Sequence, residues 1–378
     1  MSPLRLCFVG PAASVTLRRC VNWFAARGHE VTVITVEPVN PSSQAFHQID
    51  VSMPLWPRKL GRVVAAARMA LAVRQLKPDV LHIQYLRGLA WGLPLARFHP
   101  CVATPWGSDI LEEQGAFREW YSRALTRGVL RWADLVTVHS AYMESRVREL
   151  LTKMPQITRI GRGIDLQTFR PDLDVAPLRR RWEIEEDRPV IFSPRLARPF
   201  YNHDRIIRAL PTVREKFPKA LLVVAEQFAD AAYATALRRL AVDLGIADQV
   251  KFVGAIPHLE MPLWLNLSDA VVMVPRSDGM PNTLLEALAC GTVPILNRLP
   301  QYAELIEHGV NGFLVDPDEG DLAGALIGVL SDPGLKRDIA RRNRDLVVKI
   351  SDQDQEMSRM ESWYFKLAAA SSNGGPAD

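Results

Sequence analysis

Short apolar runs alternate with longer amphipathic stretches along nearly the whole chain. Such runs are typical of parallel strands that are buried on both faces, and the amphipathic stretches between them are typical of covering helices. Ten runs predict strands, five in each half, at 4–10, 31–36, 79–85, 101–104 and 135–140, then at 189–194, 220–226, 250–254, 270–275 and 293–297. The pattern therefore predicts an α/β protein with two doubly wound domains instead of one very wide sheet.

A charged, proline-containing stretch separates the two groups of strands. Residues 165–185 lack a sustained apolar period, so we place the domain boundary there, between 166 and 167. In doubly wound sheets a ligand binds at the carboxyl ends of the strands. The small and polar residues at 371–378 predict a disordered tail.

The segment 276–291 holds the strongest candidate for a binding site. A loop with Asp278 and Gly279 leads into a predicted helix that Gly291 ends. Because a helix N-terminus presents backbone N–H groups and the positive end of the helix dipole, this loop predicts a site for an anion such as a diphosphate. Glu286 lies too far inside the helix for a capping box if Asn282 is the N-cap. Its carboxylate suits the two hydroxyls of a ribose, and a solvated helix glutamate is the alternative.

The same segment resembles the family 4 glycosyltransferases. Asp278 stands at the family's loop acid, Glu286 follows eight positions later at its glutamate, and 291–294 matches its Gly-x-x-Pro motif. Upstream, SPRLARPF resembles the family's arginine-bearing strand end, with Arg195 at the diphosphate position. The likeness extends over nearly the whole chain and is most specific from about 250 to 317.

The resemblance implies the GT-B fold, in which two Rossmann-like domains face a central cleft. It also implies retaining transfer of a sugar from a UDP- or GDP-type nucleotide sugar, with no metal ion and no other cofactor. The N-terminal domain, 1–166, would bind the acceptor and be completed by a C-terminal helix at about 346–370. The C-terminal domain, 167–345, would bind the nucleotide sugar. For 346–370 a simple surface helix is the alternative.

Site residues follow from the resemblance one by one. Arg195 would stabilise the departing diphosphate, Glu286 would bind the ribose, and Asp278, Gly279 and Met280 would lie along the donor sugar. The start of the predicted helix would complete the nucleotide-sugar site with Asn282, Thr283 and Leu284.

Four features depart from the family's pattern. The loop acid is commonly glutamate and here is Asp278, while Tyr201 falls near the place of a phosphate-neutralising lysine. Arg198 or His203 is then needed to supply that charge. Trp106 takes the place of a histidine in the N-terminal domain, and Gly-Pro-Ala-Ala-Ser replaces the double-glycine loop after the first strand. These changes affect the site more than the fold.

Polar residues near strand ends in the first half are further candidates. Asp109 lies in a Gly-Ser-Asp turn where crevice residues belong, and we count it as a third catalytic candidate beside Arg195 and Asp278. A helix N-cap for 110–114 is the alternative. For His82 and His139, which lie within predicted strands, a packed histidine is the alternative to a functional one.

Charge is distributed unevenly along the chain. Residues 1–165 hold 21 basic and 12 acidic residues, whereas the remainder holds 25 and 30. This asymmetry favours an anionic partner for the first half, such as a membrane surface or a lipid-linked acceptor, and a solvated basic surface is the alternative. Arginines and aromatic residues at helical spacing in 117–135 fit a face on anionic lipid, and equally a packed surface helix.

Other patterns exclude several classes of protein. Four scattered cysteines predict neither a disulfide framework nor a metal site, and no apolar run reaches the roughly 20 residues that cross a bilayer. We expect a cytoplasmic protein, with the inner face of the plasma membrane and cell-envelope polysaccharide or glycolipid synthesis as its setting. The nucleotide-binding motifs Gly-x-Gly-x-x-Gly and Walker A are absent, and little beyond charge favours nucleic acid. The alternatives are a catalytically impaired nucleotide-sugar-binding protein and a GT-B nucleotide-sugar epimerase.

Overall fold

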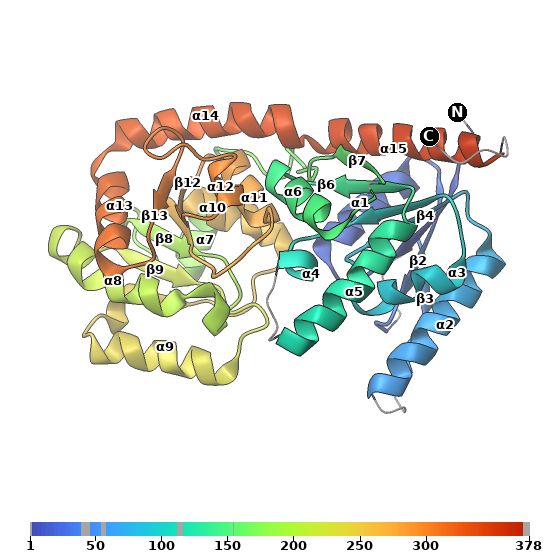
Figure 1. The fold of residues 1–378 in the computed structure, drawn as a ribbon. Helices are drawn as coiled ribbons and strands as arrows, with labels where there is room; N and C mark the ends of the chain where they lie inside the picture. Colours follow the sequence, from blue (N-terminus) through green and yellow to red (C-terminus); the bar gives the residue numbers. More distant parts are fainter. Residues whose placement is uncertain (1, 39–45, 54–57, 112–115, 154, 373–378) are drawn as a thin grey trace. The chain divides into compact units, whose positions relative to one another are not determined.

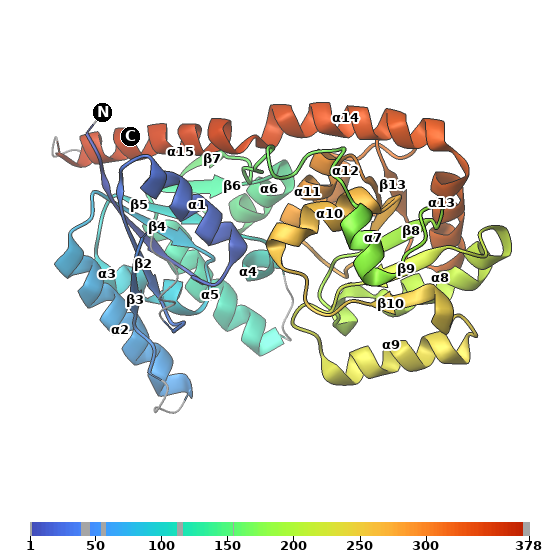
Figure 2. The ribbon, with the colours of Figure 1, turned by 180° about the vertical axis from the view of Figure 1, so that it is seen from behind.

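The computed structural model describes residues 2–38, 46–53, 58–111, 116–153 and 155–372. The chain folds into two units, one from Met1–Gly163 with Asp354–Asp378 and the other from Ile164–Gln353. Each unit is a parallel sheet with helices on both faces (Figure 1 and Figure 2). The predicted α/β class with two doubly wound, Rossmann-like domains is therefore confirmed. That the first domain binds an acceptor and the second a nucleotide sugar stays a prediction.

The first unit is built on a seven-stranded sheet of order β3-β2-β1-β4-β5-β6-β7. Its strands are β1 (Arg5–Val9), β2 (Glu30–Thr35), β3 (His47–Asp50), β4 (Val80–Gln84), β5 (Cys101–Thr104), β6 (Leu135–Val138) and β7 (Gln156–Arg159). Its helices are α1 (Val15–Ala26), α2 (Arg58–Leu76), the 3₁₀ turn η1 (Gly88–Gly92), α3 (Leu93–Ala96), α4 (Ser108–Leu111), α5 (Ala116–Trp132) and α6 (Ala141–Leu150). The strand order reverses direction between β1 and β4.

The second unit is built on a six-stranded sheet of order β10-β9-β8-β11-β12-β13. Its strands are β8 (Val190–Ser193), β9 (Leu221–Val224), β10 (Val250–Phe252), β11 (Ala270–Met273), β12 (Val293–Asn297) and β13 (Phe313–Val315). Its α-helices are α7 (Ala176–Trp182), α8 (His203–Lys216), α9 (Ala231–Asp243), α10 (Met261–Leu267), α11 (Asn282–Cys290), α12 (Pro300–Ala303), α13 (Glu319–Ser331) and α14 (Pro333–Ser351), and its 3₁₀ turns are η2 (Pro199–Tyr201), η3 (Ala247–Gln249) and η4 (His258–Glu260). The strand order reverses between β8 and β11.

Three strands lie outside the ten predicted runs. β3, β7 and β13 each form one edge of a sheet, where one side of the strand lacks a neighbour and burial is incomplete. None of the residues of β3 or β7 is buried, and β13 has only three residues. The prediction of five strands in each half was therefore wrong. β3 and β7 lack the apolar run by which central strands are recognised, and β13 is short, whereas the fourth edge strand, β10, was predicted.

The predicted boundary region belongs to the second unit. The division lies between Gly163 and Ile164, ahead of the predicted limit after residue 166. Ile164 and Phe169 are buried in the core of the second unit at 0% and 1% exposure. Turns separate these apolar positions, so they produce no regular period in the sequence.

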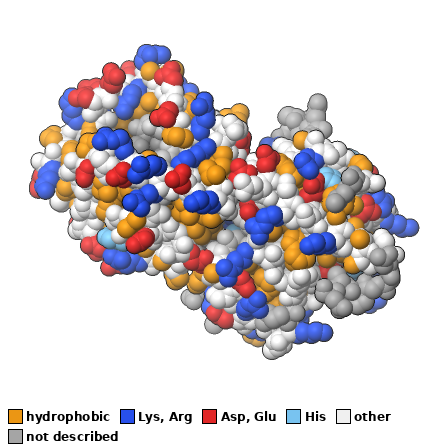
Figure 3. All heavy atoms as spheres, turned by 90° about the horizontal axis from the view of Figure 1, so that it is seen from above, with side chains coloured by type: hydrophobic (Ala, Val, Ile, Leu, Met, Phe, Trp, Pro, Cys, Tyr) orange, Lys and Arg blue, Asp and Glu red, His pale blue; other side chains and the backbone are white. Residues whose placement is uncertain are grey.

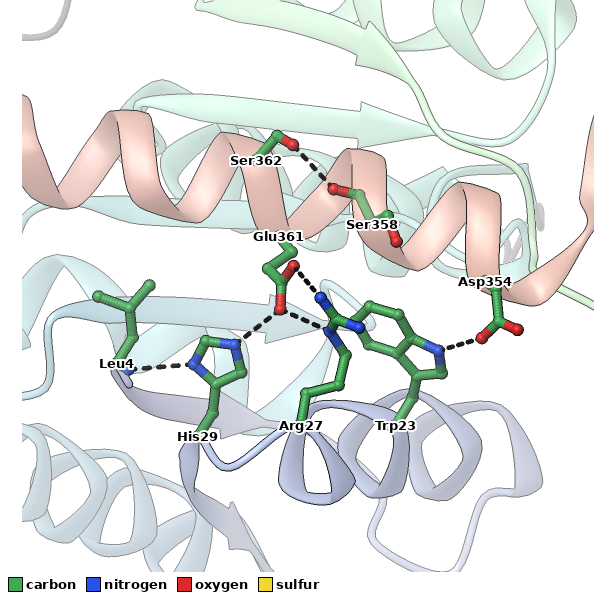
Figure 4. Close-up of polar contacts among 8 residues, drawn as sticks. All are labelled: Leu4, Trp23, Arg27, His29, Asp354, Ser358, Glu361 and Ser362. Atoms are coloured by element: carbon green, nitrogen blue, oxygen red, sulfur yellow. Dashed lines mark hydrogen bonds and ion pairs between the residues drawn. The ribbon is translucent and has the colours of Figure 1, made fainter. Parts of the chain in front are cut away.

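The last helix, α15 (Gln353–Ser372), packs on the first unit. Figure 4 shows Glu361 of α15 between Arg27 and His29, with guanidinium nitrogens at 2.9 and 3.0 Å and His29 Nε2 at 2.9 Å. Trp23 Nε1 donates to Asp354 Oδ1 at 2.7 Å. The return to the first unit begins at Asp354 and not at about 346, because α14 packs on α11 in the second unit. Of the predicted disordered tail, 373–378 lies outside the described residues, while α15 continues through Ser372.

No helix in the described part of the chain combines the length and the apolar character that a membrane-crossing segment needs.

Candidate functional site

The main candidate residues lie at the carboxyl edge of the second sheet. Arg195 follows β8 and Asp278 follows β11, the two strands between which the strand order reverses. In doubly wound sheets this reversal point is where the loops diverge and ligands bind. The topology therefore brings together two residues that are 83 positions apart in the sequence.

Arg195 and Asp278 form an ion pair that is largely shielded from water. Arg195 Nη2 donates to Asp278 Oδ2 at 2.8 Å, and the two side chains are 15% and 14% exposed. Tyr302 donates its hydroxyl to the same oxygen at 2.9 Å, and the Gly279 N–H donates to Oδ1 at 2.8 Å. Burial alone would lower the pKa of Arg195, but the charge of Asp278 and the nearby tyrosine hydroxyls outweigh burial and raise it. The guanidinium is therefore a fixed cation whose charge Asp278 balances.

Tyr201 occupies the place of the missing lysine and stacks on Arg195. The centre of its ring lies 4.8 Å from the guanidinium carbon, which is a cation–π contact and adds no second charge. His203 does not supply that charge either, because burial lowers its pKa to about 4 and leaves it neutral near pH 7. Arg198 is exposed and its Nε donates to the Phe228 carbonyl at 2.9 Å. Of the two substitutes considered from sequence, His203 is thus excluded.

Buried polar atoms without a hydrogen-bond partner accumulate at the same edge of the sheet. Ser193, with its Oγ, ends β8, and Arg195, with its Nε, lies two residues further on. Asn297, with its Oδ1, ends β12, and Gln301, with its Oε1, lies on α12. An unpaired buried polar group costs free energy, so a concentration of such groups is unusual in a protein at rest. The set contains both donors and acceptors, which suits a ligand that carries phosphate oxygens as well as hydroxyl groups.

Helix α11 begins within this edge without a side-chain cap. Its N-cap is Pro281, so the assumption that Asn282 caps the helix was wrong, and no acidic residue stands in its first turn. The positive end of the helix dipole is thus uncompensated by protein carboxylates on this helix. Leu284 donates its N–H to the Pro281 carbonyl at 3.1 Å, and its side chain is fully buried. The Leu284 side chain therefore packs in the core, while the predicted contacts of Asn282, Thr283 and Leu284 with a nucleotide sugar stay predictions.

Met280 and Gly279 precede α11 in different settings. Met280 is 3% exposed and belongs to the hydrophobic core of the second unit. Gly279 contributes its N–H to Asp278, as described above. Their predicted positions along a donor sugar stay a prediction.

Glu286 is buried and faces a histidine that the sequence analysis did not identify. It is 2% exposed, which excludes the solvated helix glutamate, and its Oε1 lies 3.0 Å from His258 Nε2. His258 lies in η4, with its ring 5.3 Å from that of Phe169 and its side chain 31% exposed. The sequence did contain a signal for His258, because this histidine lies in the loop after a predicted strand, 250–254, as Arg195 lies after the predicted strand 189–194. The predicted ribose contact of Glu286 stays a prediction.

Asp109 holds two loops of the first unit together. Its carboxylate is 2% exposed and accepts from the backbone N–H groups of Leu86 at 2.8 Å, Trp106 at 3.0 Å and Gly107 at 2.9 Å. Burial raises the pKa of Asp109, and these hydrogen bonds oppose the shift. The N-cap alternative was wrong, since α4 begins at Ser108 and places Asp109 inside its first turn. Residues 112–114 of the predicted helix lie outside the described residues.

His82 in β4 and His139, which directly follows β6, are packed residues. His82 Nε2 lies 2.6 Å from Thr104 Oγ1 and its Nδ1 contacts the Tyr364 hydroxyl at 2.5 Å, while burial lowers its pKa to about 3. His139 Nδ1 lies 2.8 Å from the Ile160 carbonyl, and burial lowers its pKa as well. Both histidines are therefore neutral near pH 7.

A cavity of about 520 Å³ lies at the carboxyl edge of the first sheet, where the order reverses between β1 and β4. Gly10 closes one side, and a Cβ there would lie 2.7 Å from the Gln84 carbonyl oxygen, so this position requires glycine. Tyr85 lines the cavity with φ of +75°, in the left-handed region that few non-glycine residues adopt. The remaining lining includes Arg62, Arg87, Trp91 and Tyr121. Sequence analysis missed this cavity, although five of its lining residues end or directly follow predicted strands, namely Gly10, Pro11, Val36, Glu37 and Tyr85.

Two family models match the chain, one in each unit. "Glycosyltransferase Family 4" matches residues 13–168, and "Glycosyl transferases group 1" matches 174–346. A GDP-mannose-dependent alpha-(1-6)-phosphatidylinositol monomannoside mannosyltransferase of Mycolicibacterium smegmatis is 31% identical over 221 residues. That match covers 56% of this chain and 57% of the relative, so the chain spans little more than half the length of that protein.

Solved structures share the fold of the whole chain. Sucrose-phosphate synthase from Thermosynechococcus elongatus gives a TM-score of 0.83 at 20% identity and covers 97% of this chain and 99% of that one. Anabaena HepE, solved in complex with UDP, gives 0.79 at 18% identity over 96% of this chain and 100% of that one. At these identities the likeness establishes the arrangement of helices and strands.

Proposed function

Because the chain belongs to the family 4 glycosyltransferases and has their two Rossmann-like domains, we propose that it transfers a sugar from a nucleotide sugar to an acceptor. The donor is of the UDP or GDP type and binds at the carboxyl edge of the second sheet. One observation carries the proposal. A buried arginine, an uncapped helix start and unpaired polar atoms occur together at the point where the strand order reverses.

The diphosphate of the donor binds beside Arg195 and the start of α11. When the bond to the sugar breaks, negative charge develops on the diphosphate, and a fixed guanidinium and a helix N-terminus stabilise that charge. Arg195 Nε, which is buried and lacks a hydrogen-bond partner, is the donor that a phosphate oxygen would satisfy. These groups supply the positive charge without a metal ion, and we propose metal-independent transfer with retention, as the family resemblance implies.

The ribose of the nucleotide binds Glu286. A buried carboxylate accepts hydrogen bonds from two neighbouring hydroxyls more strongly than an exposed one, because water does not compete. His258 lies 3.0 Å from Glu286 Oε1 and holds that carboxylate in one orientation.

The acceptor is a glycan, a small molecule or a lipid-linked sugar, and we propose the lipid-linked class at the inner face of the plasma membrane. Support comes from the basic first half and from the mannosyltransferase relative, whose name specifies GDP-mannose and a phosphatidylinositol mannoside. Cell-envelope glycolipid or polysaccharide synthesis is the corresponding setting, and GDP-mannose is the first donor to test.

The second candidate function is a nucleotide-sugar-binding protein with impaired catalysis. The observation that favours it is the charge at the diphosphate site. Asp278 balances Arg195, His203 is neutral and Tyr201 adds no cation. An epimerase on the same fold would in addition need its own acid–base pair.

Ligand-induced thermal stabilisation tests the donor site. We expect either UDP or GDP to raise the melting temperature, and neither ADP nor CMP to do so. A ligand at about 100 times its Kd adds roughly 2.7 kcal/mol to the free energy of unfolding, so the shift is measurable. Glu286→Ala should abolish the shift. Glu356→Ala is the matched control, because Glu356 is equally buried, at 4% exposure, but belongs to the first unit.

Transfer from the donor whose base stabilises the protein then separates the two functions. Release of the diphosphate in the presence of an acceptor supports the transferase, and stabilisation without any release supports the binding protein. A shift that Glu286→Ala retains would show that the donor site is misplaced.

A further inference from the structure

Helix α2 carries apolar side chains on two opposite faces. One face packs in the core of the first unit through Ala65, Met69 and Val73. The other face is exposed, with Leu60 at 54%, Val63 at 66% and Leu71 at 56%, and Ala67 is exposed between them. Spacings of three, four and four residues place Leu60, Val63, Ala67 and Leu71 in one stripe along the helix. Packing in the core of the first unit explains why the first face is apolar, but it does not explain the apolar side chains of the exposed face.

Helix α5 adds exposed aromatic side chains nearby. Trp120 and Tyr121 are 67% and 51% exposed. Helix α3 contacts both α2 and α5, and the three lie on the same side of the first sheet (Figure 1). Both long helices also line the cavity described above, α2 through Arg62 and Ala65, and α5 through Tyr121 and Ser122. We call the exposed residues Leu60, Val63, Ala67, Leu71, Trp120 and Tyr121, together with the exposed arginines Arg62, Arg68, Arg74, Arg123, Arg127 and Arg131, the α2/α5 surface.

This surface is strongly basic. In the parts of the two helices whose side chains the structure describes, residues 60–76 and 120–132, six arginines are exposed, three on each helix, and no acidic residue occurs. By contrast, basic, acidic and hydrophobic side chains are intermixed on the face shown in Figure 3. Exposed aliphatic and aromatic side chains among arginines are the combination that suits the interface of an anionic bilayer. The apolar groups enter the boundary of head groups and acyl chains, and the arginines meet phosphates.

We propose that the α2/α5 surface docks the protein on a bilayer that contains anionic phospholipid. The cavity between the same helices then opens at the membrane and receives the head group of a lipid acceptor. That last step rests on the proposed transfer function, whereas the docking itself does not. A second copy of this chain fits the surface less well, because two basic surfaces repel each other when they pair.

Co-sedimentation with vesicles tests the docking in the full chain. We expect binding to phosphatidylcholine vesicles that contain phosphatidylglycerol, and little binding to phosphatidylcholine alone. Each basic side chain near an anionic surface strengthens binding about fivefold, so Arg127→Glu should weaken it by more than about tenfold. Raised salt should weaken it as well, since ions screen charges beyond roughly 10 Å at 0.1 M.

Matched variants separate docking from general effects of charge. Val63→Asp, at a residue 66% exposed, is compared with Val242→Asp, at a residue 64% exposed on α9 of the second unit. Arg127→Glu is compared with Arg239→Glu, also on α9. We expect only the variants on α2 and α5 to lose binding. Circular dichroism and the melting temperature check that all four variants fold.

Three results would overturn the proposal. The first is equal binding to both kinds of vesicle, and the second is equal vesicle binding by Val63→Asp and Val242→Asp. The third is a protein that binds no vesicles but forms a dimer, which Val63→Asp dissociates. The last result would assign the surface to self-association. Nucleotide-induced stabilisation is measured without vesicles, so its failure would count against the proposed function and leave the docking result unaffected.

Discussion

At the scale of single residues, Arg195 is the cation of the proposed diphosphate site, and neither Tyr201 nor His203 adds a second positive charge to it. Arg195 has one carboxylate within 2.8 Å, a tyrosine ring on its face and a neutral histidine two residues after that tyrosine. A diphosphate that binds here must compete with Asp278 for the same guanidinium. The motif predicted the arginine and the acid, but their pairing depends on two loops that meet only in the folded sheet.

Tyr201→Lys tests whether that missing charge limits donor binding. A lysine ammonium near the diphosphate adds a charge-assisted hydrogen bond, so we expect the affinity for the stabilising nucleoside diphosphate to rise about tenfold. Titration calorimetry at low and high salt measures the effect, and the gain should shrink with salt. Tyr201→Phe keeps the ring over Arg195 and should bind like the unsubstituted protein. Unchanged affinity in Tyr201→Lys would place the diphosphate away from residue 201.

At the scale of elements, the apolar runs predicted the central strands because those strands are buried on both faces. The edge strands β3 and β7 have polar, partly exposed residues and gave no comparable signal. Glu286 could be predicted because it lies within a motif, whereas His258 belongs to another element and meets Glu286 only through tertiary packing. For the same reason the stripe on α2 was not recognised, since a sequence does not reveal which of two apolar faces is covered.

Helix α15 is attached to the first unit mainly by burial and less by its ion pairs. Tyr364 is fully buried and its hydroxyl contacts His82, so we expect Tyr364→Ala to lower the free energy of unfolding by about 3–5 kcal/mol. Tyr364→Phe removes only the hydroxyl and should cost about 1–3 kcal/mol, because His82 Nδ1 then lacks a partner. The half-exposed Arg27 pairs with Glu361, and Arg27→Ala should cost no more than about 1 kcal/mol. Urea unfolding measures all three, and a reversed order would show that polar contacts hold the helix.

At the scale of the whole molecule, each unit contains at least one buried histidine that folding keeps neutral. His82 in the first unit has a pKa of about 3 and His203 in the second a pKa of about 4, in both cases because burial disfavours the charged ring. In the unfolded chain both titrate near 6.5. The unfolded state therefore binds more protons at acid pH, and stability is lost as the pH falls below about 6.5.

This pH dependence can be assigned to a unit. Between about pH 6 and pH 4.5, each such histidine should lower the free energy of unfolding by up to about 1.4 kcal/mol per pH unit. His82→Gln should reduce that slope for the unfolding transition of the first unit, and His203→Gln should reduce it for the transition of the second. His47 is exposed, so His47→Gln is the control variant. Urea unfolding from about pH 7 to about pH 4.5, followed by tryptophan fluorescence, measures the slopes. Because the two units have separate cores, a substitution in one unit should leave the pH slope of the other unit unchanged. An equal change in the slopes of both units would mean that they unfold as one cooperative body.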